Sequence, residues 1–216
     1  KSYDWSKDVE TFRSLGSATD EWMRNNFENR YPEEKENTVM ITSNPYAGLI
    51  LDDSNWMHIE KVWEYVDWDN NGTVLPTDLT DAAIRTRREY PDADIYIIHY
   101  LQPHVPFIDS DLSKGIDIDN FGQMDTKKTV WQELRDGNLD RETVWDAYQN
   151  NLQVALDDLD KLKNNFEAEK MVISSDHGNA LGEVPLIYGH PPGVAIDSLR
   201  NVPWFTISAE DTQEYQ

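Results

Sequence analysis

Four short apolar runs, each separated from the next by helix-like sequence, constrain the fold of this 216-residue chain more than any other feature. The runs cover residues 38–43, 94–101, 170–174 and 202–208, and the helical patterns cover residues 19–27, 56–66, 79–90, 129–136 and 140–166. Strands that alternate with helices of this length are typical of a parallel sheet. We therefore predict one α/β domain over residues 1–216, with a doubly wound, mostly parallel sheet flanked by helices on both faces.

Chemically active residues follow three of these four predicted strands. Asn44 follows the first, residues 99–104 include two histidines at the end of the second, and Asp176 and His177 follow the third. In open α/β sheets, ligands bind beyond the carboxyl ends of the strands. The sequence therefore predicts a functional site at that edge of the sheet.

The stretch from Asp176 to His190 combines residue types that bind divalent metal ions. Asp176 and His177 are adjacent, and His190 follows His177 by thirteen residues. Carboxylate oxygen and imidazole nitrogen suit zinc or manganese, and the intervening glycines let the backbone fold back toward one point. We predict that these three residues are metal ligands, although a complete site needs a further carboxylate and an open position. The alternative is a loop in which Asp176 caps a turn and the histidines are exposed.

Several short motifs resemble those of a known family. Ser-Asp-His-Gly at 175–178, Leu-Gly-Glu at 181–183, Tyr-Gly-His-Pro at 188–191 and Val-Pro-Trp at 202–204 look like the C-terminal half of the alkaline phosphatase and sulfatase superfamily. The sulfatase-like hydrolases of haloarchaea are the most similar members, because their motifs also resemble residues 16–19, 42–45 and 99–107. The resemblance extends over nearly the whole chain, and the Asp-His-Gly and Gly-His pair is its most specific part.

The resemblance implies a doubly wound α/β sandwich that transfers or hydrolyses a phosphate or sulfate ester with a divalent metal ion, either zinc, manganese, calcium or magnesium. Asp176 and His177 would bind one ion, and His190 would help to bind the same ion or a neighbouring one. His104 would face the transferred group or its leaving oxygen as a catalytic residue. Metal ions neutralise charge on a phosphoryl or sulfuryl group, and an imidazole can protonate a leaving oxygen. The flanking prolines also permit a purely structural role for His104.

The chain departs from this resemblance near its N-terminal end. The superfamily's first strand ends in one or two metal-binding aspartates and is accompanied by a nucleophilic Thr, Ser or Cys, and no such strand precedes Ser2. Ser17 and Thr19 stand before a predicted helix, which either side chain can cap, and their flanks differ from those of a nucleophile segment. We therefore expect a sheet that lacks the usual first strand.

Two classes of function stay open at this point. The first is a metal-dependent hydrolase or transferase acting on phosphate or sulfate esters, with a small molecule, a lipid or a glycan ester as its substrate. The second is a non-catalytic relative that serves as a binding or structural module. A nucleophile segment upstream of Lys1 would favour the enzyme, and a native chain that begins there would favour the module.

Negative charge is spread along the whole sequence. The 41 acidic residues exceed the 19 basic ones, which gives a net charge of −22 and argues against nucleic acid or an anionic membrane surface as a partner. Acids distributed in this way favour a salt-adapted organism and a cytoplasmic location, because salt screens their repulsion; an ordinary acidic protein is the alternative. No apolar stretch reaches about 18 residues, so no membrane span is predicted. The absence of cysteine excludes disulfides and thiolate ligands.

Two polar segments lead to further predictions. The spacing of a calcium-binding loop between two helices is matched by Asp67, Asp69, Asn71 and Asp78. A proline late in this loop, an aspartate at the last ligand position and the lack of a second calcium-binding loop favour a simple turn before a helix instead. Residues 108–128 are polar and contain glycine, so we expect a surface insertion there.

Overall fold

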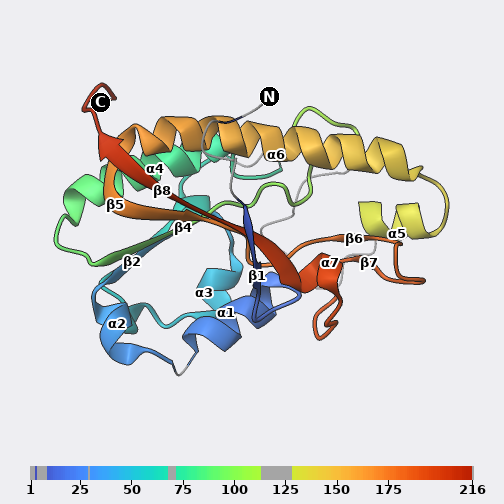
Figure 1. Cartoon of the computed structure of the whole chain (residues 1–216), viewed down its shortest axis with the longest axis horizontal. Coiled ribbons are helices and arrows are strands. Elements are labelled where there is room, and N and C mark those ends of the chain that lie inside the picture. Colours follow the sequence, from blue (N-terminus) through green and yellow to red (C-terminus); the bar gives the residue numbers. More distant parts are fainter. Residues whose placement is uncertain (1–2, 4–8, 29, 68–71, 113–127, 216) are drawn as a thin grey trace.

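A computed structural model describes residues 3, 9–28, 30–67, 72–112 and 128–215 (Figure 1). Its strands form a parallel sheet in the order β3-β2-β4, an antiparallel sheet in the order β1-β8-β5 and a two-stranded ribbon, β6-β7. Their bounds are β1 Glu10–Arg13, β2 Thr38–Thr42, β3 His58–Lys61, β4 Ile95–His99, β5 Asn165–Ile173, β6 Ala180–Leu181, β7 Tyr188–Gly189 and β8 Asn201–Asp211. The expected α/β architecture with a parallel sheet is confirmed, and the antiparallel sheet is an addition to it.

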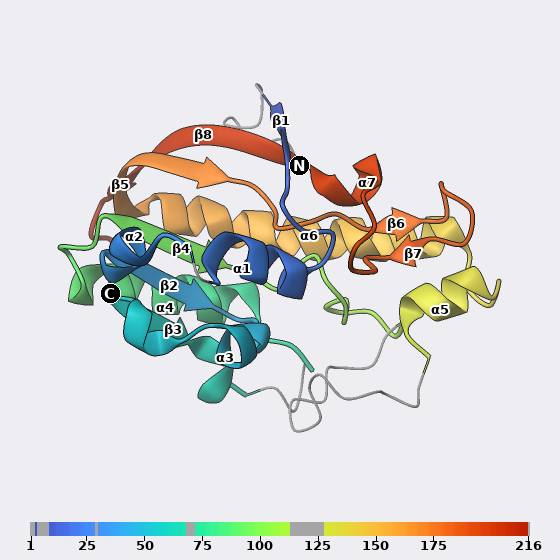
Figure 2. The ribbon, with the colours of Figure 1, turned by 90° about the horizontal axis from the view of Figure 1, so that it is seen from below.

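Helices cover both faces of the parallel sheet. The helices are α1 Thr19–Phe27, α2 Pro32–Glu36, α3 Tyr46–Ile50, α4 Pro76–Glu89, α5 Val130–Arg135, α6 Arg141–Lys163 and α7 Asp197–Arg200, with 3₁₀ turns η2 Asp53–Asn55 and η3 Val62–Glu64. Val39 and Ile41 of β2 share a core with α4 and α6, whereas Met40 on the other face packs with Trp22 and Phe27 of α1. Figure 2 shows α1 and α4 next to the strands of the parallel sheet. Because side chains alternate along a strand, β2 contributes to both cores.

The predicted helix over residues 56–66 is wrong. Trp56, Ile59 and Trp63 have helical spacing, but residues 58–61 form β3, which pairs in parallel with β2 from Val39 onward. Only the short turn η3 follows it. Ile59 lies in the core cluster that contains Met40, so burial beside β2 overrides the local helical pattern. The sequence analysis predicted no strand near the N-terminal end, yet β1 forms there by pairing with β8.

Two predictions fall partly or wholly on residues outside the described part of the chain. Two of the four ligand positions of the possible calcium loop, Asp69 and Asn71, lie outside the described residues. The expected surface insertion at 108–128 includes residues 113–127, which are also outside it. Among the helices that are described, none is both long and apolar enough to cross a membrane.

Candidate active site

The segments that follow β4 and β5 meet at one end of the molecule. Asp176 Oδ2 lies 3.6 Å from Nε2 of His99, the last residue of β4. The rings of His177 and His190 have centroids 4.5 Å apart, and His190 Nε2 lies 3.1 Å from Nε2 of His104. The structure thus brings together all four residues predicted to form a site, at the carboxyl ends of two strands. Their chemical roles follow from the details of these contacts.

The loop that carries Asp176 is held by backbone contacts. The Ser14 hydroxyl donates to the Asp176 carbonyl, and the Gly178 N–H donates to the Leu199 carbonyl at 2.8 Å. A Cβ at position 178 would lie 2.2 Å from the Ser198 carbonyl oxygen, so only glycine allows this approach to α7. These contacts fix the backbone position of Asp176 and His177.

The Asp176 carboxylate is the charged centre of the site. Its Oδ1 accepts from the His177 N–H at 2.9 Å, and its Oδ2 accepts from the Thr19 hydroxyl at 2.6 Å. Burial alone would raise the pKa of Asp176. The electrostatic effect of the neighbouring His177, the nearby His99 and the hydrogen bond from Thr19 outweigh that effect and hold this pKa well below its ordinary value. Asp176 is therefore ionised at neutral pH.

Thr19 belongs to the site, although the sequence analysis set it aside. It is the first residue of α1, and the residue before it, Ala18, is the N-cap, which makes no side-chain capping bond. The Thr19 hydroxyl is instead directed at Asp176 and lies 3.2 Å from His177 Nε2. Thr19 is 7% exposed. The signal that could have found it was the resemblance of residues 16–19, which we discounted because of the flanking sequence.

His177 is held in one tautomer by the backbone. Its Nδ1 lies 2.8 Å from the Gly178 carbonyl oxygen. A carbonyl oxygen only accepts hydrogen bonds, so this assignment places the ring proton on Nδ1. The Nε2 lone pair then points toward Thr19, available to a proton or a metal ion. We call Thr19, Asp176 and His177 the Asp176 group.

His104 and His190 form a second unit, which we call the imidazole pair. His104 Nδ1 contacts the Val105 carbonyl, so by the same reasoning His104 Nε2 accepts from His190 Nε2–H. Nδ1 of His190 then carries a lone pair, and it is buried with no hydrogen-bond partner in the described chain. Burial lowers the pKa of both imidazoles, and repulsion from neighbouring imidazoles lowers it further. Both rings are therefore neutral at neutral pH.

The loop bearing His190 is tied to the helix bearing Thr19. The Glu21 carboxylate accepts from the backbone N–H of Ser17 at 2.7 Å and of Gly193 at 3.3 Å. The Val194 N–H donates to the Ser17 hydroxyl at 3.1 Å. The Ser17 backbone bond lowers the pKa of Glu21, so this anchor stays charged. Residues far apart in the chain thus place the imidazole pair beside the Asp176 group.

A metal ion fits the Asp176 group better than the ligand set predicted from the sequence. No group of three or more His, Asp or Glu side chains in the described residues converges on a common point, because His190 Nε2 is paired with His104. Asp176 Oδ2 and His177 Nε2 are 3.5 Å apart, and Thr19 Oγ1 lies close to both. Ligand atoms about 2.0–2.2 Å from one zinc ion have roughly such separations. The separation of Asp176 Oδ2 and His177 Nε2 is thus compatible with two ligands of one ion.

Comparison with known proteins identifies the fold. No protein-family model and no curated protein matches the chain. Among solved structures it is similar to the C-terminal periplasmic domain of phosphoethanolamine transferase EptC from Campylobacter jejuni, with a TM-score of 0.57, 19% identity, and coverage of 93% of this chain and 68% of that one. For the soluble domain of lipooligosaccharide phosphoethanolamine transferase A from Neisseria meningitidis, the TM-score is 0.57 and the identity 18%, over 97% of this chain and 68% of that one. For the zinc complex of the EptC periplasmic domain from Escherichia coli, the TM-score is 0.57 and the identity 13%, over 96% of this chain and 64% of that one.

These likenesses, all below 20% identity, concern the fold. They confirm the expected α/β fold. The named neighbours come from bacteria, so they give no support to the haloarchaeal likeness. The predicted cytoplasmic location is wrong: the matched structures from Campylobacter and Escherichia are periplasmic domains, which favours an extracytoplasmic location. Acidic composition was a poor guide, because surface charge reports on solvation and not on compartment.

Proposed function

We propose that this chain transfers or hydrolyses the phosphoryl group of a phosphate ester, with Thr19 as the nucleophile. The observation that carries the proposal is the buried Thr19 hydroxyl, which contacts both the ionised Asp176 carboxylate and the Nε2 lone pair of His177. A hydroxyl becomes a useful nucleophile when an adjacent group accepts its proton. The hydroxyl donates its one proton to Asp176 and lies 3.2 Å from His177 Nε2, the second group that could take this proton.

The position of Thr19 on α1 also suits an anionic substrate. The first turn of a helix presents unpaired backbone N–H groups and the positive end of the helix dipole. Phosphate groups bind at such positions. α1 has nine residues and its N-cap offers no side-chain acceptor, so the N–H groups of its first turn can receive phosphoryl oxygens. Nucleophile and oxyanion donors would then come from the same turn.

The proposed reaction proceeds in two balanced steps. Thr19 Oγ1 attacks phosphorus as the ester bond breaks, and the Thr19 proton moves to His177 Nε2, where Asp176 stabilises the resulting imidazolium. The departing oxygen takes that proton and leaves as an alcohol. Water or an acceptor alcohol then attacks the phosphothreonine, giving its proton to the unpaired Nδ1 of His190, and Thr19 is restored as that proton returns to it. His104 acts through His190, whose Nε2–H it accepts.

A divalent ion such as zinc would be held by Asp176, His177 Nε2 and Thr19 Oγ1, and it would then take the place of His177 as the group that favours the deprotonated hydroxyl, besides neutralising charge on the phosphoryl oxygens. The donor set supports this part of the proposal, because the second nitrogen of His177 is held by a backbone carbonyl, as is usual for histidine ligands. A zinc complex among the similar structures points the same way.

The neighbours favour phosphate over sulfate as the transferred group. They are phosphoethanolamine transferases, and one of them is a lipooligosaccharide phosphoethanolamine transferase. We therefore extend the proposal to a phosphate monoester or diester, carried by a lipid, a glycan or a small molecule. A non-catalytic binding module is the rival function, and the same experiment separates the two.

The test is turnover and adduct formation with nitrophenyl phosphate and nitrophenyl sulfate, in the presence of zinc or manganese. We expect release of nitrophenol from the phosphate ester and a phosphorylated Thr19 detected by mass spectrometry. Thr19→Ala should abolish both, with a loss on the order of 10⁴-fold or more, whereas Thr11→Ala, on exposed β1, is the matched control. Protein that binds metal yet is inert on both esters would support the binding module. Turnover of sulfate alone would refute the phosphoryl proposal.

A further inference from the structure

One face of α6 contacts both segments that form the candidate site. Asn151 of α6 is buried, and its Nδ2 donates to the His104 carbonyl at 2.9 Å. Tyr148 lies one turn earlier on the same face, because residues three apart on a helix are neighbours. The Tyr148 hydroxyl lies 3.5 Å from Nδ2 of Asn179, which follows Asp176 by three residues. α6 therefore holds the loop of His104 and carries Tyr148 to the loop of Asp176.

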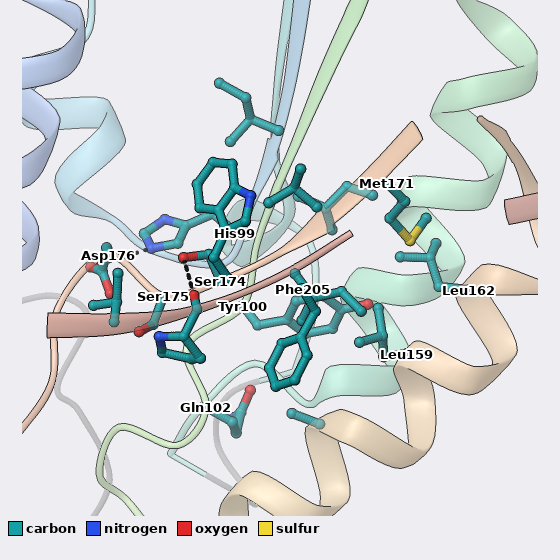
Figure 3. A pocket seen from close by; sticks show the side chains of 18 of the residues that line it. His99, Tyr100, Gln102, Leu159, Leu162, Met171, Ser174, Ser175, Asp176 and Phe205 are labelled. Atoms are coloured by element: carbon teal, nitrogen blue, oxygen red, sulfur yellow. Dashed lines mark hydrogen bonds and ion pairs between the residues drawn. The ribbon is translucent and has the colours of Figure 1, made fainter. Parts of the chain in front are cut away.

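Tyr148 and Asn179 line the same cavity as the three residues of the Asp176 group. The cavity has a volume of about 1580 Å³, so a phosphate ester fits inside it. Figure 3 shows Asp176 beside His99 at one end of this cavity and Leu159 of α6 on the opposite side. Tyr148 thus reaches the space in which the proposed function requires a phosphoryl group.

Two aromatic neighbours hold the ring of Tyr148. Its centroid lies 5.8 Å from that of Trp145, with 11° between the ring planes, and 6.4 Å from that of Phe107, with 84° between the planes. Stacked and edge-to-face pairs of this kind are favourable. Phe107 is itself buried in a core cluster with Trp131. The position of the Tyr148 hydroxyl is therefore set before a ligand binds, as a preorganised hydrogen-bond donor requires.

The contact between Tyr148 and Asn179 leaves one donor unused. An amide nitrogen only donates, so the Tyr148 oxygen accepts from Asn179 Nδ2, and its own O–H proton takes no part in this bond. In the described chain no acceptor contacts that proton. Burial and the charge of Asp176 raise the pKa of Tyr148 despite the hydrogen bond from Asn179, so the hydroxyl is protonated at neutral pH. Tyr148 therefore offers a free O–H donor to the cavity.

Asn179 has a free atom as well. Its Oδ1 is buried and has no hydrogen-bond partner among the described residues. β6 starts at the next residue, Ala180, which pairs with Gly189, so the register places Asn179 opposite His190. Nδ1 of His190 is also buried without a partner there. Buried polar atoms without partners cost free energy, so both atoms indicate that a bound molecule completes this part of the site.

We propose that Tyr148 is a further catalytic residue, whose hydroxyl donates a hydrogen bond to a phosphoryl oxygen of the substrate, and that Asn179 holds the hydroxyl in this orientation. This inference rests on the proposed function. The first turn of α1 offers backbone N–H donors to the phosphoryl group, and Tyr148 supplies one more from α6. No bond of Tyr148 is made or broken, because the hydroxyl only stabilises negative charge on the oxygen that it contacts. Asn179 acts through Tyr148 and is a positioning residue.

The test is Tyr148→Phe, which removes only the hydroxyl. We expect kcat on nitrophenyl phosphate to fall about 10²-fold with KM little changed, because one donor to the charged oxygen is lost. The affinity of zinc-loaded protein for orthovanadate, which mimics the phosphoryl group during transfer, should fall by a similar factor. Tyr65→Phe, at an exposed position outside the site, is the matched control and should change neither value. A lower Tm with unaltered vanadate affinity would show a purely structural role for the hydroxyl and would overturn the proposal.

Asn179→Ala tests the positioning role. It should lower kcat about tenfold with KM unchanged, yet cause no further loss when combined with Tyr148→Phe, because Asn179 acts only through that hydroxyl. Equal losses with and without the Tyr148 hydroxyl would refute this role. Vanadate binding also separates the two proposals. Protein that binds vanadate through Tyr148 but turns over no ester would refute the proposed function alone, whereas turnover and vanadate binding that survive Tyr148→Phe would refute this inference alone.

Discussion

The Asp176 group and the imidazole pair lie side by side but differ in how their polar atoms are satisfied. In the first, a carboxylate with a lowered pKa accepts hydrogen bonds from Thr19 and a backbone N–H and lies 3.6 Å from His99. In the second, two buried imidazoles stay neutral and one nitrogen of His190 has no partner among the described residues. The comparison teaches that negative charge is concentrated on one side of the site, and neutral imidazole on the other.

Asp176→Asn should have the largest effect on this comparison. It keeps the shape of the side chain but removes the charge that accepts the Thr19 proton and stabilises His177. We expect turnover of nitrophenyl phosphate to fall about 10³-fold, together with loss of zinc in elemental analysis. Asp136→Asn, which changes an exposed ion pair with Lys128, is the matched control. Unaltered zinc content and rate would show that the charge lies elsewhere.

His190→Ala should have an intermediate effect, because it removes the unpaired proton acceptor without touching the Asp176 group. A fall in turnover of about 10²-fold is expected, with zinc stoichiometry unchanged. The decisive measurement is metal content. If the variant lost its zinc, His190 would be a metal ligand, as the sequence predicts, and the distinction between the two units would break down.

His104→Gln should have a smaller effect, since His104 acts only through His190. A glutamine can still accept the His190 Nε2–H, so we expect a fall of about tenfold or less in kcat with KM unchanged. His104→Ala removes the acceptor and should approach the effect of His190→Ala. A glutamine variant as impaired as the alanine variant would instead place His104 in direct contact with the substrate.

The pH dependence should show the smallest change and report on the imidazole pair alone. The lowered pKa of His104 and His190 keeps both rings neutral in the folded protein when pH falls below about 6.5, the ordinary value. The rate at which the phosphothreonine breaks down, the step in which His190 accepts the proton, should therefore keep its plateau below pH 6.5. Unfolded histidines take up protons there, so stability should decline with falling pH over the same range, measured as a lower Tm. An activity limb at pH 6.5 or higher would contradict the neutral pair.

Sequence reasoning succeeded where a local pattern and a tertiary role coincide. The apolar run at residues 38–43 became β2, the capped pattern at 19–27 became α1, and the leucine stripe of residues 140–166 became α6. It failed for β3, whose aromatic residues have helical spacing, and for β1, which exists only because β8 pairs with it. In both failures a strand partner distant in sequence decided the conformation.

The candidate site divides in the same way. The motif from Asp176 to His190 predicted metal-binding residues. The positions of His99 and His104 at the end of a predicted strand indicated the edge of the sheet at which the site would lie. Thr19 was set aside because its flanking residues differ from a nucleophile segment, and its contact with Asp176, 157 residues away, is visible only in the folded chain. The sequence also could not show that His190 Nδ1 has no hydrogen-bond partner in the described chain, because this depends on the contacts of His104 with Val105 and with His190.

By itself, the sequence determined which residue types could take part in catalysis or metal binding, and that they follow strands of an α/β fold. Strand and helix periodicity depends on residues close together in the sequence, so it can be recognised without the structure. Only the tertiary structure decided which of these residues act together. It placed the Thr19 hydroxyl beside the Asp176 carboxylate, and it placed His190 between His104 and His177. Those outcomes depend on contacts between distant segments, and hydrogen-bond direction, burial and charge are fixed only when such segments meet.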